Sequence, residues 1–255
     1  MRIVIKVGTS TLAHATGKLN IRRTGELCQV ISDLKNAGHE VILVSSGAIG
    51  MGVGKLALAE KPTDIPTKQA AAAVGQCELM YTYDRLFLEY GHTVAQILLT
   101  GSDFTAEDRH ENFNNTIKRL LELGALPIIN ENDTIATEEI KVGDNDTLSA
   151  LVSVSVRADL LVILSDVDGL YSADPHKDKT AKLIEEIHGI DEHVLSLAGG
   201  VGSSLGTGGM KTKLTAAKLC NTSGVDMVIA NGENPAILYT IVNGEKGNYT
   251  KFFAR

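Results

Sequence analysis

Short apolar runs that end in polar, glycine-rich turns recur along this 255-residue chain, and helical patterns separate one run from the next. The run at 159–164, DLLVIL, is almost wholly apolar, as expected for a strand that is covered on both faces. The runs that we predict to be strands lie at 2–7, 40–44, 92–99, 126–129, 159–164 and 225–230. Strands that alternate with helices form a mostly parallel sheet with helices on both faces. The sequence therefore predicts an α/β fold.

Amphipathic spacing predicts the helices between these strands. Leu27, Val30, Ile31 and Leu34 follow the i, i+3, i+4, i+7 pattern, and Gly38 ends that helix. Further helices are predicted at 68–90, with a break near Gly75, and at 106–123, 148–156, 210–222 and 236–242, with a turn at 8–11 and a last strand from residue 250. We expect one domain of residues 1–255 with an N-terminal lobe to about residue 157 and a C-terminal lobe from about residue 158.

Composition and charge exclude several classes of function. The net charge is −7 and no basic stripe is present, so nucleic acid is not an expected partner. No apolar run is long enough to span a membrane, and the N-terminus enters a strand directly, without a signal sequence. Cys28, Cys77 and Cys220 lie far apart, so we predict buried free thiols in a reducing, cytoplasmic environment.

The unusual turns at 8–11, 45–50, 130–146 and 165–169 each follow a predicted strand. In a parallel sheet these turns share one edge, where ligands bind. Nine Asp, Asn or Glu residues lie between 130 and 146, more than turn formation or helix capping requires. Asn145 or Thr147 is the expected helix cap. Asp133, Asp144 and Asp146 are candidates to ligate Mg²⁺, to bind an ammonium group or to orient lysines.

A glycine-rich segment at 205–213, LGTGGMKTK, is a candidate phosphate site. Its glycines expose backbone N–H groups at a predicted helix start, and Lys211 and Lys213 add positive charge. It is not a Walker A loop, since Met210 stands where glycine is needed before the lysine. The alternative is a solvated basic loop. Lys6, beside a possible anion-binding turn at 8–10, is either a second anion ligand or an outward lysine on an edge strand.

A loose dinucleotide-binding pattern, GVGKLA, occurs at 52–57. A dinucleotide-binding unit also needs a strand that ends in an acidic residue about 20 residues further on, and KPTDIP at 61–66 does not supply one. We interpret this match as accidental.

Taken in order, IKVGTS (5–10), HEVILVSSGAI (39–49), PIINEND (127–133), EIKVGDNDTLSAL (139–151), SDVDGLYSADP (165–175) and GTGGMKTK (206–213) resemble the amino acid kinase superfamily and, within it, the glutamate 5-kinases. The resemblance implies a three-layer α/β/α sandwich of the carbamate kinase type. It implies transfer of the γ-phosphoryl group of ATP to the side-chain carboxylate of L-glutamate, the first step of proline synthesis. The chain stops at Arg255, so no PUA domain of the RNA-binding type is expected, and Ser165 stands where threonine is commoner.

The resemblance also implies residue roles. Lys6 and Lys213 would flank the transferring phosphoryl group, and Asp146 would hold both lysines in place. Ser46 and Asn145 would donate to acceptor carboxylate oxygens, and Asp133 would bind the α-ammonium. The expected nucleotide-binding residues are Lys6, Ser165, Asp166, Thr207, Gly208, Gly209, Met210, Lys211, Thr212 and Lys213, with backbone N–H donors at Gly8, Thr9, Gly47 and Gly209. Mg²⁺ would bind the ATP phosphates, with no protein metal ligand assigned.

The family further implies inhibition by proline and assembly into a dimer or tetramer. Within the superfamily the alternatives are N-acetylglutamate kinase, aspartokinase and uridylate kinase. Asp133 distinguishes the first of these, because a neutral acetamide needs no ammonium partner. A nucleotide-binding regulator without catalysis is disfavoured by the presence of both lysines and Asp146. A dinucleotide oxidoreductase remains testable by titration with NAD(P)H.

Overall fold

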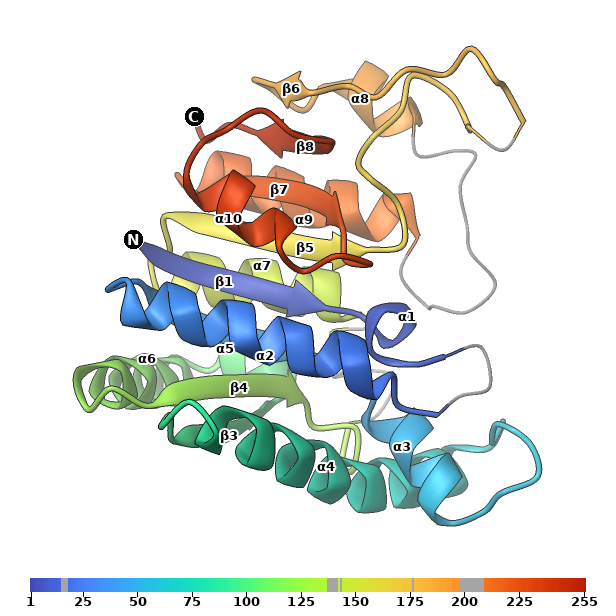
Figure 1. The fold of residues 1–255 in the computed structure, drawn as a ribbon, viewed down its shortest axis with the longest axis vertical. Coiled ribbons are helices and arrows are strands. Elements are labelled where there is room, and N and C mark those ends of the chain that lie inside the picture. Colours follow the sequence, from blue (N-terminus) through green and yellow to red (C-terminus); the bar gives the residue numbers. More distant parts are fainter. Residues whose placement is uncertain (15–17, 137–141, 143, 176, 198–208) are drawn as a thin grey trace.

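The structure is a computed structural model that describes residues 1–255 except 15–17, 137–141, 143, 176 and 198–208 (Figure 1). Its described strands form one sheet in the order β3-β4-β2-β1-β5-β7-β8-β6. They are β1 (Arg2–Val7), β2 (Glu40–Ser45), β3 (Val94–Leu99), β4 (Leu126–Glu131), β5 (Leu160–Ser165), β6 (Glu186–Ile187), β7 (Asp226–Asn231) and β8 (Tyr249–Phe252). Strands β1, β2, β3, β4, β5 and β7 run parallel, and β8 is antiparallel to β7. The predicted mostly parallel sheet is confirmed.

Helices cover both faces of this sheet. They are α1 (Thr9–Leu12), α2 (Ile21–Asn36), α3 (Ala48–Lys55), α4 (Ile65–Leu88), α5 (Ser102–Thr105), α6 (Glu107–Glu122), α7 (Asn145–Ser155), α8 (Glu192–Ser196), α9 (Met210–Thr222) and α10 (Ile237–Val242). Helices α2, α4 and α10 pack on one face, and α6, α7 and α9 pack on the other (Figure 1). The three-layer α/β/α sandwich is therefore confirmed.

Alternation along β1 decides which side chain reaches which layer. Ile3, Ile5 and Val7 point into the core beneath α2 and α4, whereas Val4 points into the core beneath α7 and α9. Lys6 is two residues from Val4, so it shares the α7 and α9 face. A lysine on a central, buried strand needs a counter-ion, because an isolated ammonium group is costly to bury.

The predicted break in the 68–90 helix is wrong, since α4 runs without interruption from Ile65 to Leu88. Gly75 serves close packing instead. A Cβ atom on Gly75 would lie 1.7 Å from the carbonyl oxygen of Ala48, and one on Gly52 would lie 1.8 Å from that of Ala71. Both glycines let α3 and α4 cross backbone to backbone, and any larger side chain would force the helices apart.

Other differences concern the ends of elements. The predicted turn at 8–11 is largely the short helix α1. Helix α7 begins at Asn145, and its cap is Asp144, whose Oδ1 accepts a hydrogen bond of 2.8 Å from the Thr147 backbone N–H. The expected caps at Asn145 or Thr147 are therefore wrong. Residues 137–141 and 143 of the polar turn and residues 205–208 of the glycine-rich segment lie outside the described residues. Sequence patterns did not predict α5, α8 or β6.

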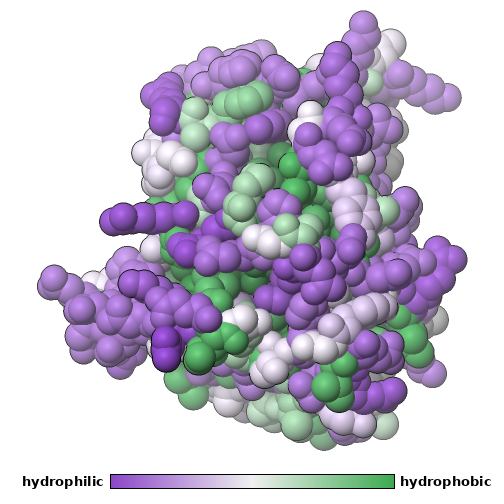
Figure 2. Space-filling view, turned by 60° about the vertical axis from the view of Figure 1, so that its left-hand side comes forward, coloured by the Kyte–Doolittle hydropathy of each residue, from purple (hydrophilic) through white to green (hydrophobic). Residues whose placement is uncertain are grey.

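The surface of the molecule that Figure 2 shows is mostly polar. The face in Figure 2 is mainly hydrophilic, with apolar areas between the charged side chains. None of the described helices is both long and apolar enough to cross a bilayer.

Two of the three cysteines are buried. Burial raises the pKa of the Cys28 thiol far above its ordinary value and that of Cys220 to about 12. Cys77 is exposed on α4, so the prediction of three buried thiols is wrong at that position.

Candidate active site

The candidate site lies at the edge of the sheet where β1, β2, β4 and β5 end, next to the first turns of α7 and α9 (Figure 1). Parallel pairing sets the ends of β1 and β2 side by side, with Val7 opposite Ser45. The predicted meeting of the polar turns at one edge is thus confirmed for the residues that the structure describes.

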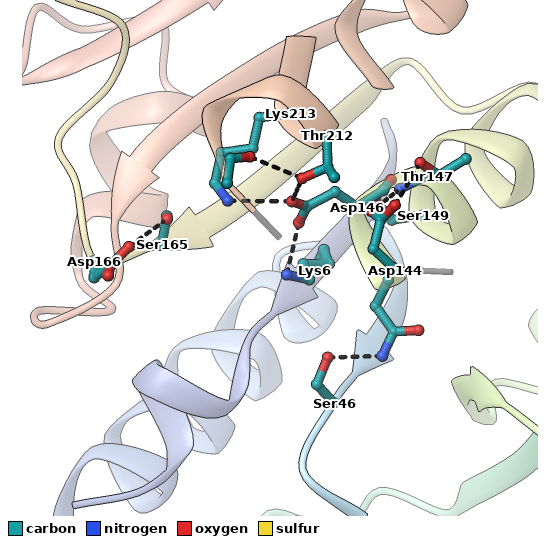
Figure 3. A network of polar contacts seen from close by, with 12 residues as sticks. Lys6, Ser46, Asp144, Asp146, Thr147, Ser149, Ser165, Asp166, Thr212 and Lys213 are labelled. Atoms are coloured by element: carbon teal, nitrogen blue, oxygen red, sulfur yellow. Dashed lines mark hydrogen bonds and ion pairs between the residues drawn. The ribbon is translucent and has the colours of Figure 1, made fainter. Parts of the chain in front are cut away.

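The centre of the site is a buried cluster of three charges. Asp146 Oδ1 lies 2.6 Å from Lys6 Nζ, and Asp146 Oδ2 lies 3.1 Å from Lys213 Nζ. Figure 3 shows the two lysines approaching the carboxylate from β1 and α9. Asp146 is 1% exposed, Lys6 8% and Lys213 5%. Thr212 adds a hydroxyl group, whose Oγ1 lies 2.8 Å from Asp146 Oδ2 and 2.8 Å from the carbonyl oxygen of Gly209.

Electrostatics keep Asp146 ionised. Burial alone raises the pKa of this carboxyl group, but the charges of Lys6 and Lys213 and hydrogen bonds from Lys6 and Thr212 lower the pKa to about 2. With both lysines protonated, the three side chains carry a net charge of about +1. The cluster is therefore internally paired and still attracts an anion to the strand ends.

A second group of side chains, all neutral, adjoins this cluster. Asn145 precedes Asp146 on α7, and its Nδ2 donates to Ser46 Oγ at 2.7 Å and to Asn130 Oδ1 at 3.0 Å. Asn130 Nδ2 in turn donates to Gln76 Oε1 at 3.0 Å. Both Asn145 Nδ2 hydrogens are thus used within the protein. The Oδ1 atom is buried, and no partner for it is found among the described residues. In this arrangement Asn145 offers an acceptor, whereas the family resemblance implies a donor at this position.

The turn that carries Ser46 is fixed by the backbone conformation of Gly47 and by a contact between Ser45 and α4. Gly47 has φ 109°, in the left-handed region that favours glycine, and it caps the N-terminus of α3. Ser45 Oγ lies 2.8 Å from the hydroxyl oxygen of the fully buried Tyr83 on α4. Burial raises the pKa of Tyr83 well above its ordinary value, so the hydroxyl stays protonated. These contacts keep the 45–47 turn against the sheet edge.

Two of the predicted backbone phosphate donors, Gly8 and Gly209, belong to the segments that carry the lysines. A Cβ atom on Gly8 would come within 3.4 Å of Lys6 Nζ, so the backbone there approaches the ammonium group closely. Thr9 opens the short helix α1, and Gly209 caps α9. The first backbone N–H groups of a helix have no partner within the helix. At the N-terminus of α9 they add to the positive field of the cluster.

The residues predicted to bind nucleotide are spread over three segments, the first of which is Lys6 on β1. At the end of β5, Ser165 Oγ donates to Asp166 Oδ1 at 3.0 Å (Figure 3). On α9, Lys213 points into the cluster, whereas Lys211 is exposed and the Met210 side chain is buried in the core. Thr207 and Gly208 lie outside the described residues. The accidental dinucleotide pattern lies mainly in α3, so it does not form a phosphate loop.

Two further observations concern Asp133 and the carboxylates that were candidates to ligate Mg²⁺. Asp133 lies in the turn after β4 and is partly buried. Among the residues that the structure describes, no three His, Cys, Asp or Glu side chains are grouped as a metal site. Asp144, one of the candidate metal ligands, is engaged as the α7 cap by the Thr147 N–H and hydroxyl groups.

Sequence reasoning missed several contributors. Asn130 was noted only as part of an acidic and amide-rich run, and Gln76 was not singled out within an alanine-rich helix. Asp168 was also missed. Its Oδ1 accepts from Asn231 Nδ2 at 2.9 Å and its Oδ2 from the Tyr171 hydroxyl at 3.1 Å, tying the turn after β5 to the end of β7. The available signal for Asn130 and Asn231 was a polar residue immediately after a predicted buried strand.

An α/β sandwich whose strand ends hold paired lysines around an aspartate defines a protein of the phosphoryl-transfer type. The model of the amino acid kinase family matches residues 1–231, and the chain belongs to that family. It is 54% identical over 248 residues to glutamate 5-kinase from Clostridium perfringens, covering 96% of this chain and 92% of that protein. It is also 54% identical over 246 residues to glutamate 5-kinase from Caldanaerobacter subterraneus subsp. tengcongensis, covering 96% of this chain and 66% of that protein.

Two solved structures share the fold. Carbamate kinase from Giardia lamblia bound to AMP-PNP superposes with a TM-score of 0.70 at 18% identity, covering 100% of this chain and 98% of that one. UMP kinase from Ureaplasma parvum gives a TM-score of 0.65 at 17% identity, covering 99% and 98%. At these identities the likeness concerns the fold alone, and it agrees with the carbamate kinase-like fold expected from the sequence.

Proposed function

We propose that this protein transfers the γ-phosphoryl group of ATP to the side-chain carboxylate of L-glutamate, giving γ-glutamyl phosphate and ADP, the first step of proline synthesis. The observation that carries the proposal is the Lys6–Asp146–Lys213 cluster, directly beside the Ser46–Asn145 pair. The high identity to glutamate 5-kinases supports the choice of glutamate. The N-terminal lobe would hold the amino acid and the C-terminal lobe the nucleotide.

The chemistry needs charge neutralisation and alignment more than proton transfer. A glutamate carboxylate oxygen attacks the γ-phosphorus, an O–P bond forms, the bond from phosphorus to the β–γ bridging oxygen breaks, and ADP leaves. The attacking carboxylate is already ionised at neutral pH, so no general base is required. Lys6 and Lys213 would stabilise the oxygens of the transferring group, and Asp146 would keep the lysines from repelling each other.

Mg²⁺ would enter on the phosphates of ATP, which commonly supply most of its ligands in kinase sites. It would neutralise phosphate charge there, in addition to the net positive charge of the lysine cluster. No described carboxylate is assigned to it, because Asp146 is paired with two lysines and Asp144 caps α7.

The acceptor end suits an amino acid. Ser46 Oγ accepts from Asn145, which leaves the hydroxyl hydrogen free to donate to a carboxylate oxygen. Asp133, which follows β4 at the same edge, is proposed to bind the α-ammonium group. Inhibition by proline, assembly into a dimer or tetramer and a cytoplasmic location stay predictions of the resemblance.

The test is an ATP-dependent hydroxamate assay with L-glutamate, N-acetyl-L-glutamate and L-aspartate in parallel, since hydroxylamine traps acyl phosphates. UMP is assayed separately by ADP release. We expect product from glutamate only, and none without ATP. Product from aspartate or N-acetylglutamate but not from glutamate would contradict the proposal, as would phosphorylation of UMP alone.

A further inference from the structure

Three side-chain amides form a continuous buried chain behind the acceptor end of the site. Gln76 is on the inner face of α4, Asn130 is near the end of β4 and Asn145 begins α7, so three elements of the fold meet here. Gln76 is 7% exposed and Asn130 2% exposed. This row of hydrogen-bonded amides ends at the Ser46 hydroxyl group.

The hydrogen bonds of this chain run in one direction only. The backbone N–H of Glu131 donates to Asn130 Oδ1 at 2.9 Å, and a backbone N–H can only donate. The atom that it meets must therefore be the oxygen of Asn130. It follows that Asn130 turns its NH₂ group towards Gln76, which must present Oε1, and that Asn145 donates its NH₂ group to Asn130 Oδ1.

This direction decides what the site offers to a ligand. Asn145 uses both amide hydrogens inward, so its remaining polar atom is the acceptor Oδ1, which is buried and lacks a partner among the described residues. Ser46 accepts from Asn145, so it can donate outward. One acceptor and one donor side by side match the ammonium and carboxylate groups of an amino acid. Two donors would match a dicarboxylate without an ammonium group.

Gln76 lies at the end of this row of amides that is farthest from Ser46, and its partner in the row is Asn130. Its Oε1 satisfies the buried NH₂ group of Asn130, while its own Nε2 is buried without a partner in the part of the chain that the structure describes. The useful atom of Gln76 is thus its oxygen. Without that oxygen, the buried NH₂ group of Asn130 would lack an acceptor, which costs about 1–3 kcal/mol, so the Asn130 amide would be held less firmly in the orientation that receives the Asn145 NH₂ group.

We propose that Gln76 is a positioning residue that acts through Asn130 to set the orientation of the Asn145 amide, so that Asn145 Oδ1 recognises the ammonium group of the amino-acid acceptor. The proposal rests on the proposed function, because it assumes an amino acid at this end of the site. Asp133 and Asn145 would then bind the ammonium group together, and Ser46 would serve the carboxylate.

The experiment compares Gln76→Met with Leu79→Met, a matched control on the same buried face of α4 that removes no side-chain hydrogen bond. For each protein we would measure kcat, the KM values for glutamate and ATP, and the inhibition constant of glutarate, which lacks the ammonium group. For Gln76→Met we expect a glutamate KM about tenfold higher, with the glutarate constant and the ATP KM changed less than about threefold. Leu79→Met should change none of these constants.

A double-mutant cycle tests the route through Asn145. In an Asn145→Ala background, Gln76→Met should no longer raise the glutamate KM, because the amide that it orients is absent. A second variant, Gln76→Glu, keeps an oxygen towards Asn130, and it should retain the discrimination between glutamate and glutarate even if added charge weakens both. It also keeps the test available if Gln76→Met fails to fold.

Three outcomes would overturn the proposal. They are an unchanged glutamate KM in Gln76→Met, equal losses for glutamate and glutarate, and additive effects in the cycle. Failure of the proposed function would look different, because the unaltered protein would then form no hydroxamate from glutamate at all.

Discussion

The two ends of the site are built from consecutive residues of α7 and yet use different physics. Asp146 joins two buried ammonium groups, while Asn145 joins a hydroxyl group and an amide. Ion pairing is strong and tolerates changes of direction, which suits a phosphoryl group that changes geometry during transfer. Hydrogen bonds between neutral amides are weaker, but each fixes a donor and an acceptor. We therefore expect the Asp146 end of the site to govern rate and the Asn145 end to govern the choice of substrate.

Removing the shared carboxylate should have the largest effect. Asp146→Ala would leave Lys6 and Lys213 buried and facing each other without a counter-ion, and breaking a buried ion pair costs about 3–5 kcal/mol. We expect kcat to fall by at least about 100-fold and the urea midpoint to fall. Asp146→Asn is the control for shape, since it keeps the size of the side chain and loses the charge. A kcat within about tenfold of the unaltered protein would break the assignment.

Two substitutions, one at the phosphoryl end of the site and one at the acceptor end, should have opposite effects on kcat and on the KM for glutamate. Lys213→Ala should lower kcat about 100-fold with little change in either KM, because its charge is needed while the phosphoryl group moves. Asp133→Ala should raise the KM for glutamate far more than that for ATP. Lys218→Ala, an exposed lysine on the same helix, is the control for Lys213. Unchanged turnover in Lys213→Ala, or equal losses of both substrates in Asp133→Ala, would contradict the division.

The smallest effect expected is on stability against pH. The pKa of Asp146 is lowered from 3.8 to about 2 in the folded protein, so its ionised form stabilises the fold by on the order of 2 kcal/mol. That contribution is fully present above a pH of about 4 and is lost as pH falls through about 2. Denaturant titrations of the unaltered protein and Asp146→Asn should therefore converge over that interval. If the two proteins were equally stable above pH 5, the stabilising role of the Asp146 charge would be contradicted.

The fold could be predicted because its determinants are local. Runs such as 159–164 show burial on both faces, and turns rich in glycine and acidic residues mark the strand ends. The break at Gly75 was wrong because glycine has two uses, to end a helix and to admit a neighbour. Only the position of α3 shows that the second use applies.

The candidate site could be predicted in part. Charged side chains are rarely buried unless they are paired, so Lys6 stands out on a predicted buried strand. Asp146 and Lys213 stand out at the starts of helices that follow polar or glycine-rich segments. Gln76 does not, since one glutamine in an alanine-rich helix is ordinary. Its role depends on the register between α4 and β4, which brings together residues that are 54 positions apart.

The cluster at Asp146 also has a consequence for the order of folding. Strand β1 pairs with β2 at residues 40–45 and with β5 at residues 160–164, so the central strand finds its neighbours late in sequence. Asp146 then needs Lys213 from α9, 67 positions further on. Loop closure over such distances is slow, and contacts of this kind form late in folding. Until α9 has docked, Lys6 and Asp146 can form only a single pair, without the net positive charge that Lys213 adds.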